Sequence, residues 1–193
     1  HNLKKTVQNN HLVKKFKKFT AVDKVSFSIY AGQIFCLLGH NGAGKTTTIK
    51  MLTGMLELDS GDVMYDGEDF ISNMEEVRKK IGICTQNDIL FEKLTVREHL
   101  ELIARLRNIP FFDISEAVDK AIHSLNLQSE SFKFSEELSG GNKRKLSLAM
   151  AILGHTKVIF LDEPTSGMDP QNRRVIWHHL RLLKEQGLTI LLT

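Results

Sequence analysis

"GHNGAGKTTT", residues 39–48, is the stretch that decides the fold. It places three glycines, one lysine and three threonines in ten positions directly after the apolar run "QIFCLL". The pattern G-x-x-x-x-G-K-[ST] runs from Gly39 to Thr46, between an expected buried strand and an apolar-periodic segment that contains Ile49 and Leu52. Glycines let successive backbone N–H groups point into one concavity, and the following helix adds the positive end of its dipole. The sequence therefore predicts a loop that binds a polyphosphate.

Two side chains of this loop have chemistry that suits a nucleotide. Lys45 would neutralise charge on the β- and γ-phosphates, and the Thr46 hydroxyl would hold a Mg²⁺ ion that bridges them. The alternative is a plain glycine turn. With glycine at about 7% of residues, the four fixed positions of the pattern arise by chance in roughly one chain per hundred of this length. The phosphate loop is therefore the stronger interpretation.

Composition sets broad limits. A chain of 193 residues that is 41% hydrophobic can bury the core of one domain with an inserted subdomain. The net charge of +3 does not describe a protein that coats nucleic acid, so we expect no nucleic-acid partner. Cys36 and Cys84 each lie in an apolar run, which favours buried, reduced thiols. No signal peptide or apolar stretch of about 20 residues is present in the sequence. The start at His1 and the end in "LTILLT" suggest a fragment of something larger.

The pattern along the chain predicts an α/β fold of the P-loop type. Residues 25–32 alternate in polarity, as expected of a half-exposed antiparallel strand, and residues 60–67 resemble another. Four apolar runs predict buried parallel strands in the interior of a sheet: residues 34–38, 81–85, 158–162 and 188–193.

Between the second and third of these runs the pattern is helical. Thr95 and Glu98 form a capping box, and Val118, Ile122 and Leu125 recur at helical spacing. We therefore expect one domain over residues 1–193. It would have an ATP-binding α/β core with an antiparallel subdomain, residues 1–87 and 154–193, and an inserted helical subdomain, residues 88–153.

Two acidic residues end the third apolar run. Asp162 and Glu163 lie at the carboxyl end of an expected strand, the edge where α/β sheets bind ligands. Asp162 suits Mg²⁺, bound through water, and Glu163 suits accepting a proton from the water that attacks the γ-phosphate. Capping of the following turn is the competing interpretation.

"LSGGNKRKLSLAMAILG", residues 138–154, offers a second helix start. Ser139, Gly140 and Gly141 precede a helix with Leu146, Met150 and Leu153 on one face. Taken alone, this stretch is explained better by a helix cap than by an anion site. A chain with two phosphate-binding ends either binds two phosphates or lends one end to a neighbour.

These motifs together carry a resemblance. "GHNGAGKT", "LSGGN", "VIFLDEP" and "SGMD" occur in the order and approximate spacing of the nucleotide-binding domain of ABC (ATP-binding cassette) transporters, and the resemblance covers nearly the whole chain. "GHNGAGKTTT", "NDILFEKLTVREHL" and "LSGGNKRKLS" look most like subfamily A, whose members are large membrane proteins that often move lipids. The resemblance implies an ATPase with ATP and Mg²⁺ as ligands. It also implies a cytosolic place on a membrane transporter, with transmembrane domains and a second nucleotide-binding domain as partners.

In this family two cassettes pack head to tail, and the signature helix of each covers the ATP of the other. The residues implied to contact the partner's γ-phosphate are Ser139, Gly140, Gly141 and Asn142. Asn142 departs from the commonest signature, which has Gln, and resembles versions in subfamily A. Gln86 resembles the glutamine that reaches Mg²⁺ and the attacking water. Asp169 matches an aspartate at the dimer interface, although Asp169-Pro170 is also a good helix start.

The resemblance also implies an aromatic residue that stacks on adenine. Phe16 takes this place, with Phe19 as a competitor and a core aromatic as the alternative. The basic stretch "KKFKKF", residues 14–19, is interpreted as a solvated edge beside adenine and not as a nucleic-acid site. The residues implied to bind ATP are Phe16, Gly39, His40, Asn41, Gly42, Ala43, Gly44, Lys45, Thr46 and Thr47. Those implied in catalysis are Glu163, Gln86 and Lys45, and those implied at Mg²⁺ are Thr46, Gln86 and Asp162.

One residue that the resemblance implies is not in the sequence. The family has a switch histidine directly after the last strand, and the sequence ends at Thr193. His178 and His179 lie inside the preceding helix, so neither replaces it. A chain without this residue is expected to bind ATP and hydrolyse it poorly. The alternative functions are a soluble ABC ATPase that acts on ribosomes or DNA, and a regulatory module that does not hydrolyse ATP.

Overall fold

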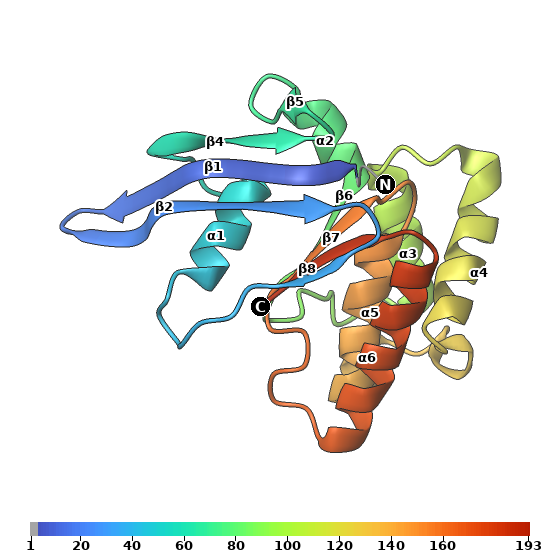
Figure 1. Cartoon of the computed structure of the whole chain (residues 1–193). Coiled ribbons are helices and arrows are strands. Elements are labelled where there is room, and N and C mark those ends of the chain that lie inside the picture. The colour runs from blue at the N-terminus through green and yellow to red at the C-terminus, as the bar shows by residue number, and fades with distance from the viewer. Residues whose placement is uncertain (1–3) are drawn as a thin grey trace.

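The computed structural model describes residues 4–193 and contains two four-stranded sheets (Figure 1). The antiparallel sheet has the order β2-β1-β4-β5, and the parallel sheet has the order β3-β8-β7-β6. The antiparallel strands are β1 (Lys5–Phe16), β2 (Phe19–Tyr30), β4 (Ser60–Tyr65) and β5 (Glu68–Asp69). The parallel strands are β3 (Ile34–Cys36), β6 (Ile81–Cys84), β7 (Val158–Leu161) and β8 (Thr189–Leu192).

The helices lie on both faces of the parallel sheet. Figure 1 shows α1 on the side of β1 and β2, and α3 to α6 on the opposite side of strands β6 to β8. The α-helices are α1 (Lys45–Leu52), α2 (Met74–Lys80), α3 (Val96–Leu106), α4 (Ile114–Ser124), α5 (Gly140–Ile152) and α6 (Pro170–Glu185). Short 3₁₀ turns cover Phe111–Asp113, Gln128–Glu130 and Ser135–Glu137.

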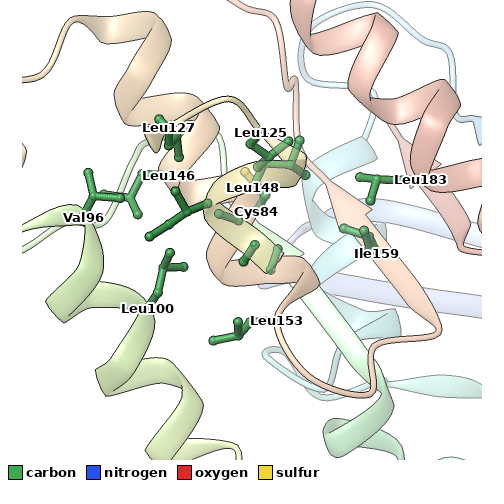
Figure 2. Close-up of a cluster of buried hydrophobic side chains, with 14 of the residues drawn as sticks. Cys84, Val96, Leu100, Leu125, Leu127, Leu146, Leu148, Leu153, Ile159 and Leu183 are labelled. Carbon is green, nitrogen blue, oxygen red and sulfur yellow. The ribbon is translucent and has the colours of Figure 1, made fainter. Parts of the chain in front are cut away.

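Two hydrophobic clusters join these layers. One cluster packs α1 between the two sheets, with Leu52 of α1 against Ile29 of β2 and Phe160 of β7 in the same buried group. The other joins the helices to the far face of the parallel sheet, and Figure 2 shows its side chains converging from several elements. Its labelled members are Cys84, Val96, Leu100, Leu125, Leu127, Leu146, Leu148, Leu153, Ile159 and Leu183.

The local expectations for strands and helices are largely confirmed. Residues 25–30 belong to an antiparallel strand, in which Ile29 is fully buried and Ser26 is exposed. The Thr95 capping box forms: the Thr95 side chain accepts from the Glu98 N–H, and Glu98 accepts from the Thr95 N–H. The division into a core and a helical subdomain over residues 88–153 stays a prediction.

The expectation of a buried strand over residues 34–38 is wrong in part. β3 covers only Ile34–Cys36 and is an edge strand of the described parallel sheet, paired with β8 alone. Phe35 stacks on Phe27 with ring centroids 4.9 Å apart, whereas Cys36 on the opposite face is exposed. The expected burial of the thiols therefore holds for Cys84 only. Burial raises the pKa of the Cys84 thiol to about 11.

Among residues 4–193, no helix has the length and apolar character needed to cross a membrane.

Candidate nucleotide site

The glycine-rich loop lies between the carboxyl end of β3 and the start of α1. Gly44 precedes the helix with φ 85°, in the left-handed region, and no side chain caps the helix start. A Cβ atom on Gly44 would lie 2.3 Å from the Ala21 carbonyl oxygen, so the loop approaches β2 more closely than a side chain allows. Gly42 also has a positive φ, 82°. The N–H groups of the first turn of α1 are thus left without a side-chain acceptor, as an anion site requires.

Lys45 folds back over this loop. Its Nζ donates to the carbonyl oxygens of Gly39 at 2.9 Å and His40 at 3.1 Å. The ammonium group is therefore held at the mouth of the loop by neutral acceptors, which an anionic phosphate would outcompete. Thr46 is exposed, and its hydroxyl makes no hydrogen bond to any residue in the described part of the chain.

A second group of candidate residues meets at the carboxyl ends of β6, β7 and β8. Gln86, two residues after β6, donates from Nε2 to Oε2 of Glu163 over 3.2 Å. Asp162 is only 5% exposed, and its Oδ1 accepts from Oγ1 of Thr193 at 2.9 Å. The same Oγ1 accepts from the Glu163 N–H at 2.9 Å. Four residues from three separate segments of the chain thus form one polar network at the sheet edge where α/β folds bind ligands.

Glu163 has a strained backbone. Its φ is 47°, in the left-handed region that residues with a side chain rarely adopt. The N–H bond to Thr193 holds this conformation from one side. Strain that the surroundings maintain at the end of a buried strand is typical of a functional residue.

The start of α5 forms the cap that the sequence suggested. The Ser139 hydroxyl accepts from the Asn142 N–H at 3.3 Å, and Ser139 and Gly140 are exposed. Figure 1 shows this helix among the group on the right of the sheet, whereas the loop before α1 lies at its left. The structure therefore does not bring the two expected phosphate-binding ends together within one chain.

Asp169 caps α6 and is linked to the start of α5. Its Oδ1 accepts from the N–H groups of Gln171 and Asn172, both at 3.0 Å, and its Oδ2 accepts from the Asn172 side chain at 2.7 Å. Donation from the Asn172 N–H, aided by the Asn172 side chain, lowers the pKa of Asp169. A Cβ on Gly141 would lie 2.9 Å from the Asn172 amide carbon. Asn172 thus joins Asp169 to the signature stretch of the same chain.

Phe16 and Phe19 face each other across the turn between β1 and β2. They are 47% and 61% exposed, so the alternative of a core aromatic is wrong for both. The Lys14 ammonium group lies 5.8 Å from the centre of the Phe16 ring, and it also pairs with Asp59 at 2.9 Å. The turn lies beside Ala21, which the loop contacts at Gly44, so an exposed ring stands near the phosphate loop.

Arg144 is a residue that the sequence reasoning missed. It is 5% exposed and donates to carbonyl oxygens on both sides of the Gln86–Glu163 contact. The apolar face expected for this helix, with Leu146 and Met150, does not include position 144, so the helical pattern gave no sign that Arg144 is buried. Thr193 was missed as well, because nothing in the local pattern marks it as a partner of Asp162.

Within residues 4–193, no group of three or more His, Cys, Asp or Glu side chains is placed to hold a metal ion. The Thr46 hydroxyl and the buried Asp162 carboxylate are oxygen ligands of the kind that Mg²⁺ prefers when substrate phosphates complete its shell. The donor set therefore fits a Mg²⁺ ion that binds with a nucleotide.

Comparison with known proteins decides the family. The family model described as "ABC transporter" matches residues 22–166. The chain belongs to the ABC transporter family. It is an ATP-binding cassette, the ATP-hydrolysing domain of that family, and its fold is similar to solved cassettes. An ATP-binding cassette of an ABC transporter, MJ1267 in its ADP conformation, has a TM-score of 0.85 and 29% identity, with 97% of this chain and 80% of that chain covered.

Similar proteins of known name belong to subfamily A of the ABC family. ATP-binding cassette sub-family A member 2 from Homo sapiens is 45% identical over 181 residues, which cover 94% of this cassette and 7% of that protein. The phospholipid-transporting ATPase ABCA3 from Homo sapiens is 46% identical over 173 residues, 90% of this cassette and 10% of that protein. The cassette thus spans about a tenth or less of the length of these relatives.

Proposed function

We propose that this cassette is the ATP-driven motor domain of a membrane transporter. The observation that carries the proposal is the convergence of Gln86, Asp162 and Glu163 at one sheet edge, together with the glycine-rich loop before an uncapped helix start. Binding of ATP would close two cassettes head to tail, and hydrolysis would open them. The attached transmembrane domains would then switch between opening to one side of the membrane and opening to the other. The chain would then lie on the cytosolic face of an integral membrane protein.

Phosphate binding would use the loop at residues 39–47 and the start of α1. The backbone N–H groups would receive the phosphate oxygens, and Lys45 would exchange its two carbonyl acceptors for the β- and γ-phosphates. Thr46, Gln86 and Asp162 would hold Mg²⁺, which supplies charge neutralisation of the phosphates when bound. Phe16 would stack on the adenine through its exposed face.

Hydrolysis would depend on the Gln86–Glu163 pair. Glu163 Oε2 would take the proton of the attacking water, and the Gln86 amide, already within hydrogen-bond distance of that oxygen, would orient the water. The Thr193 hydroxyl accepts from the Glu163 N–H and donates to the Asp162 carboxylate, which would fix the backbone that carries Glu163 before the substrate arrives. Preorganisation of this kind lowers the barrier because the groups need not reorganise during the reaction.

A second cassette would complete each site. Ser139, Gly140, Gly141 and Asn142 would contact the γ-phosphate held by the partner, since their own loop lies elsewhere in the fold. The exposed Gly140 and the uncrowded space around it leave room for a phosphate. Asp169 would meet the partner at the same interface, because Asn172 ties it to Gly141.

Lipid is the substrate class that the relatives support. ABCA3 and the retinal-specific protein ABCA4 from Homo sapiens are both named as phospholipid-transporting ATPases, and ABCA4 is 45% identical to this cassette. A soluble ABC ATPase acting on ribosomes or DNA is not favoured, because similar proteins are named as a member of sub-family A and as a phospholipid-transporting ATPase.

The test is ATP turnover with Mg²⁺ as a function of protein concentration. We would compare the 193-residue chain with a chain that includes the natural sequence after Thr193, where the switch histidine is expected. A rate that rises more than linearly with concentration in the longer chain supports a dimer-dependent ATPase. Tight ATP binding with no turnover in either chain would contradict the motor role and favour a regulatory cassette.

A further inference from the structure

A buried guanidinium lies behind the site, in a position that the proposed chemistry has not used. Arg144 lies on α5, four residues after Gly140, and its side chain is 6% exposed. Its Nε donates to the Pro164 carbonyl at 3.0 Å, and its Nη2 donates to the Asp162 carbonyl at 3.1 Å. Burial of a charge this deep is costly unless its hydrogen-bond donors are satisfied. Here the N–H groups of the planar guanidinium point at backbone carbonyl oxygens that accept from them.

The same guanidinium holds the other half of the site. Its Nη1 donates to the Thr85 carbonyl at 2.5 Å and to Oδ1 of Asp88 at 3.1 Å. Asp88 balances the charge, and Ser147 on the next turn of α5 donates to the same Oδ1 at 2.8 Å. One side chain therefore bridges the residues that flank Gln86 and those that flank Glu163.

These contacts act on the strained residue directly. The carbonyl of Glu163 accepts a longer bond from Nη2 of Arg144, 3.4 Å, while its N–H is held by Thr193. The carbonyl of Gln86 accepts a bond of the same length from Nη1. Because charged donors bind carbonyls more strongly than neutral ones, the guanidinium stabilises the left-handed turn at Glu163 and the end of the strand before Gln86 together.

We propose that Arg144 is a positioning residue for hydrolysis: it sets the separation of the Gln86 and Glu163 side chains and fastens that pair to the helix that begins at the signature. Since α5 is a regular helix, a displacement at Gly140 moves Arg144, and with it both side chains. Contact of the signature with a partner's nucleotide would then adjust this chain's own site. The proposal rests on the proposed roles of Gln86 and Glu163.

The first test needs no nucleotide. Amide hydrogen exchange of Asp162 and Glu163 is compared in the wild type, Arg144→Gln, Arg144→Lys and Lys145→Gln. The control removes one charge at the adjacent position of α5, where the side chain makes no hydrogen bond or ion pair to a described residue. We expect exchange at both amides to accelerate at least about tenfold in Arg144→Gln, because charged hydrogen bonds are lost there, and to stay unchanged in the control.

The second test separates positioning from general stability. In Arg144→Gln we expect kcat to fall at least about tenfold while KM for ATP stays within about threefold, since the phosphate loop is untouched. Arg144→Lys should give intermediate kcat and exchange rates, because lysine keeps the charge but lacks the planar guanidinium and its several fixed donors. Unchanged exchange and unchanged kcat in Arg144→Gln would overturn the proposal. If that variant does not fold, wild-type exchange and kcat in Arg144→Lys would overturn it.

A Glu163→Gln variant measured in parallel keeps the two proposals apart. If Glu163→Gln turns over ATP at the wild-type rate, the proposed function fails at Glu163 and the Arg144 proposal fails with it. If Glu163→Gln is inactive while Arg144→Gln keeps the wild-type kcat, only the positioning role of Arg144 is overturned.

Discussion

Gln86 and Glu163 are joined by a hydrogen bond of 3.2 Å between Nε2 and Oε2, although 77 positions separate them in the sequence. The parallel order of β6 and β7 makes this possible, because neighbouring parallel strands end at the same edge. The amide and the carboxylate are therefore placed as a pair by the backbone. A water molecule that bonds to either group is within reach of the other.

Replacement of Glu163 by Gln removes the proposed base and keeps the shape of the side chain. We expect turnover to fall at least about 100-fold, in line with the loss of a general base, while ATP affinity stays near that of the wild type. ATP should then accumulate in a closed dimer that size-exclusion chromatography detects. Turnover at the wild-type rate would remove Glu163 from this role.

Lys45→Met should weaken ATP binding. The variant loses an ammonium group that the loop carbonyls hold where we propose that the phosphates bind, so we expect Kd for ATP to rise at least about tenfold. Lys50→Met is the control, because Lys50 is exposed in the last turn of the same helix. Equal ATP affinities in the two variants, measured by calorimetry, would contradict the placement of the phosphates.

Gly44→Ala should destabilise the fold more than Gly32→Ala. Both glycines have a positive φ, but a Cβ on Gly32 meets open space, whereas one on Gly44 lies 2.3 Å from the Ala21 oxygen. Both variants carry about 1–2 kcal/mol of left-handed strain. We expect Gly44→Ala to lose a further 1–3 kcal/mol, roughly the cost of overpacking. Equal free energies of unfolding from urea titrations would show that the loop does not press on β2.

Acid should weaken the fold through His179. This side chain on α6 is 2% exposed, and neither ring nitrogen bonds to a described residue. Burial lowers its pKa, with Lys145 on α5 and the adjacent His178 acting in the same direction and the nearby Ser124 backbone opposing them. The unfolded chain therefore binds the proton more readily, and stability falls as pH drops below about 6.5. His179→Leu should flatten the dependence of Tm on pH between about pH 7 and 5.5, while His178→Gln should not.

The sequence predicted local structural elements better than the contacts between them. The glycine-rich loop before α1, the Thr95 capping box and the Asp169 cap are local patterns, so residues close in sequence were enough to find them. The exposure of Cys36 was missed because an apolar run does not reveal whether its strand has one neighbour or two. Arg144 was missed for a related reason. Most of its acceptors are backbone carbonyls in two distant turns, and every residue type has such a carbonyl, so the sequence does not reveal them.

The central claim is that the two phosphate-binding ends of this chain serve two different nucleotides. Gly140→Asp tests the signature end, since a side chain there meets open space and an acidic group suits a helix start, yet its charge would repel a partner's phosphate. Lys45→Met tests the loop end. Each variant alone should lack turnover, because both sites of its dimer carry a defect.

The most direct measurement is the turnover of a mixture of these two variants, prepared with different tags in chains that include the natural sequence after Thr193. In a head-to-tail dimer, each mixed pair has one site with both defects and one intact site, so an equal mixture should recover about a quarter of wild-type activity. A mixture that forms mixed dimers, shown by the tags, and yet turns over no faster than its separate components would contradict the claim.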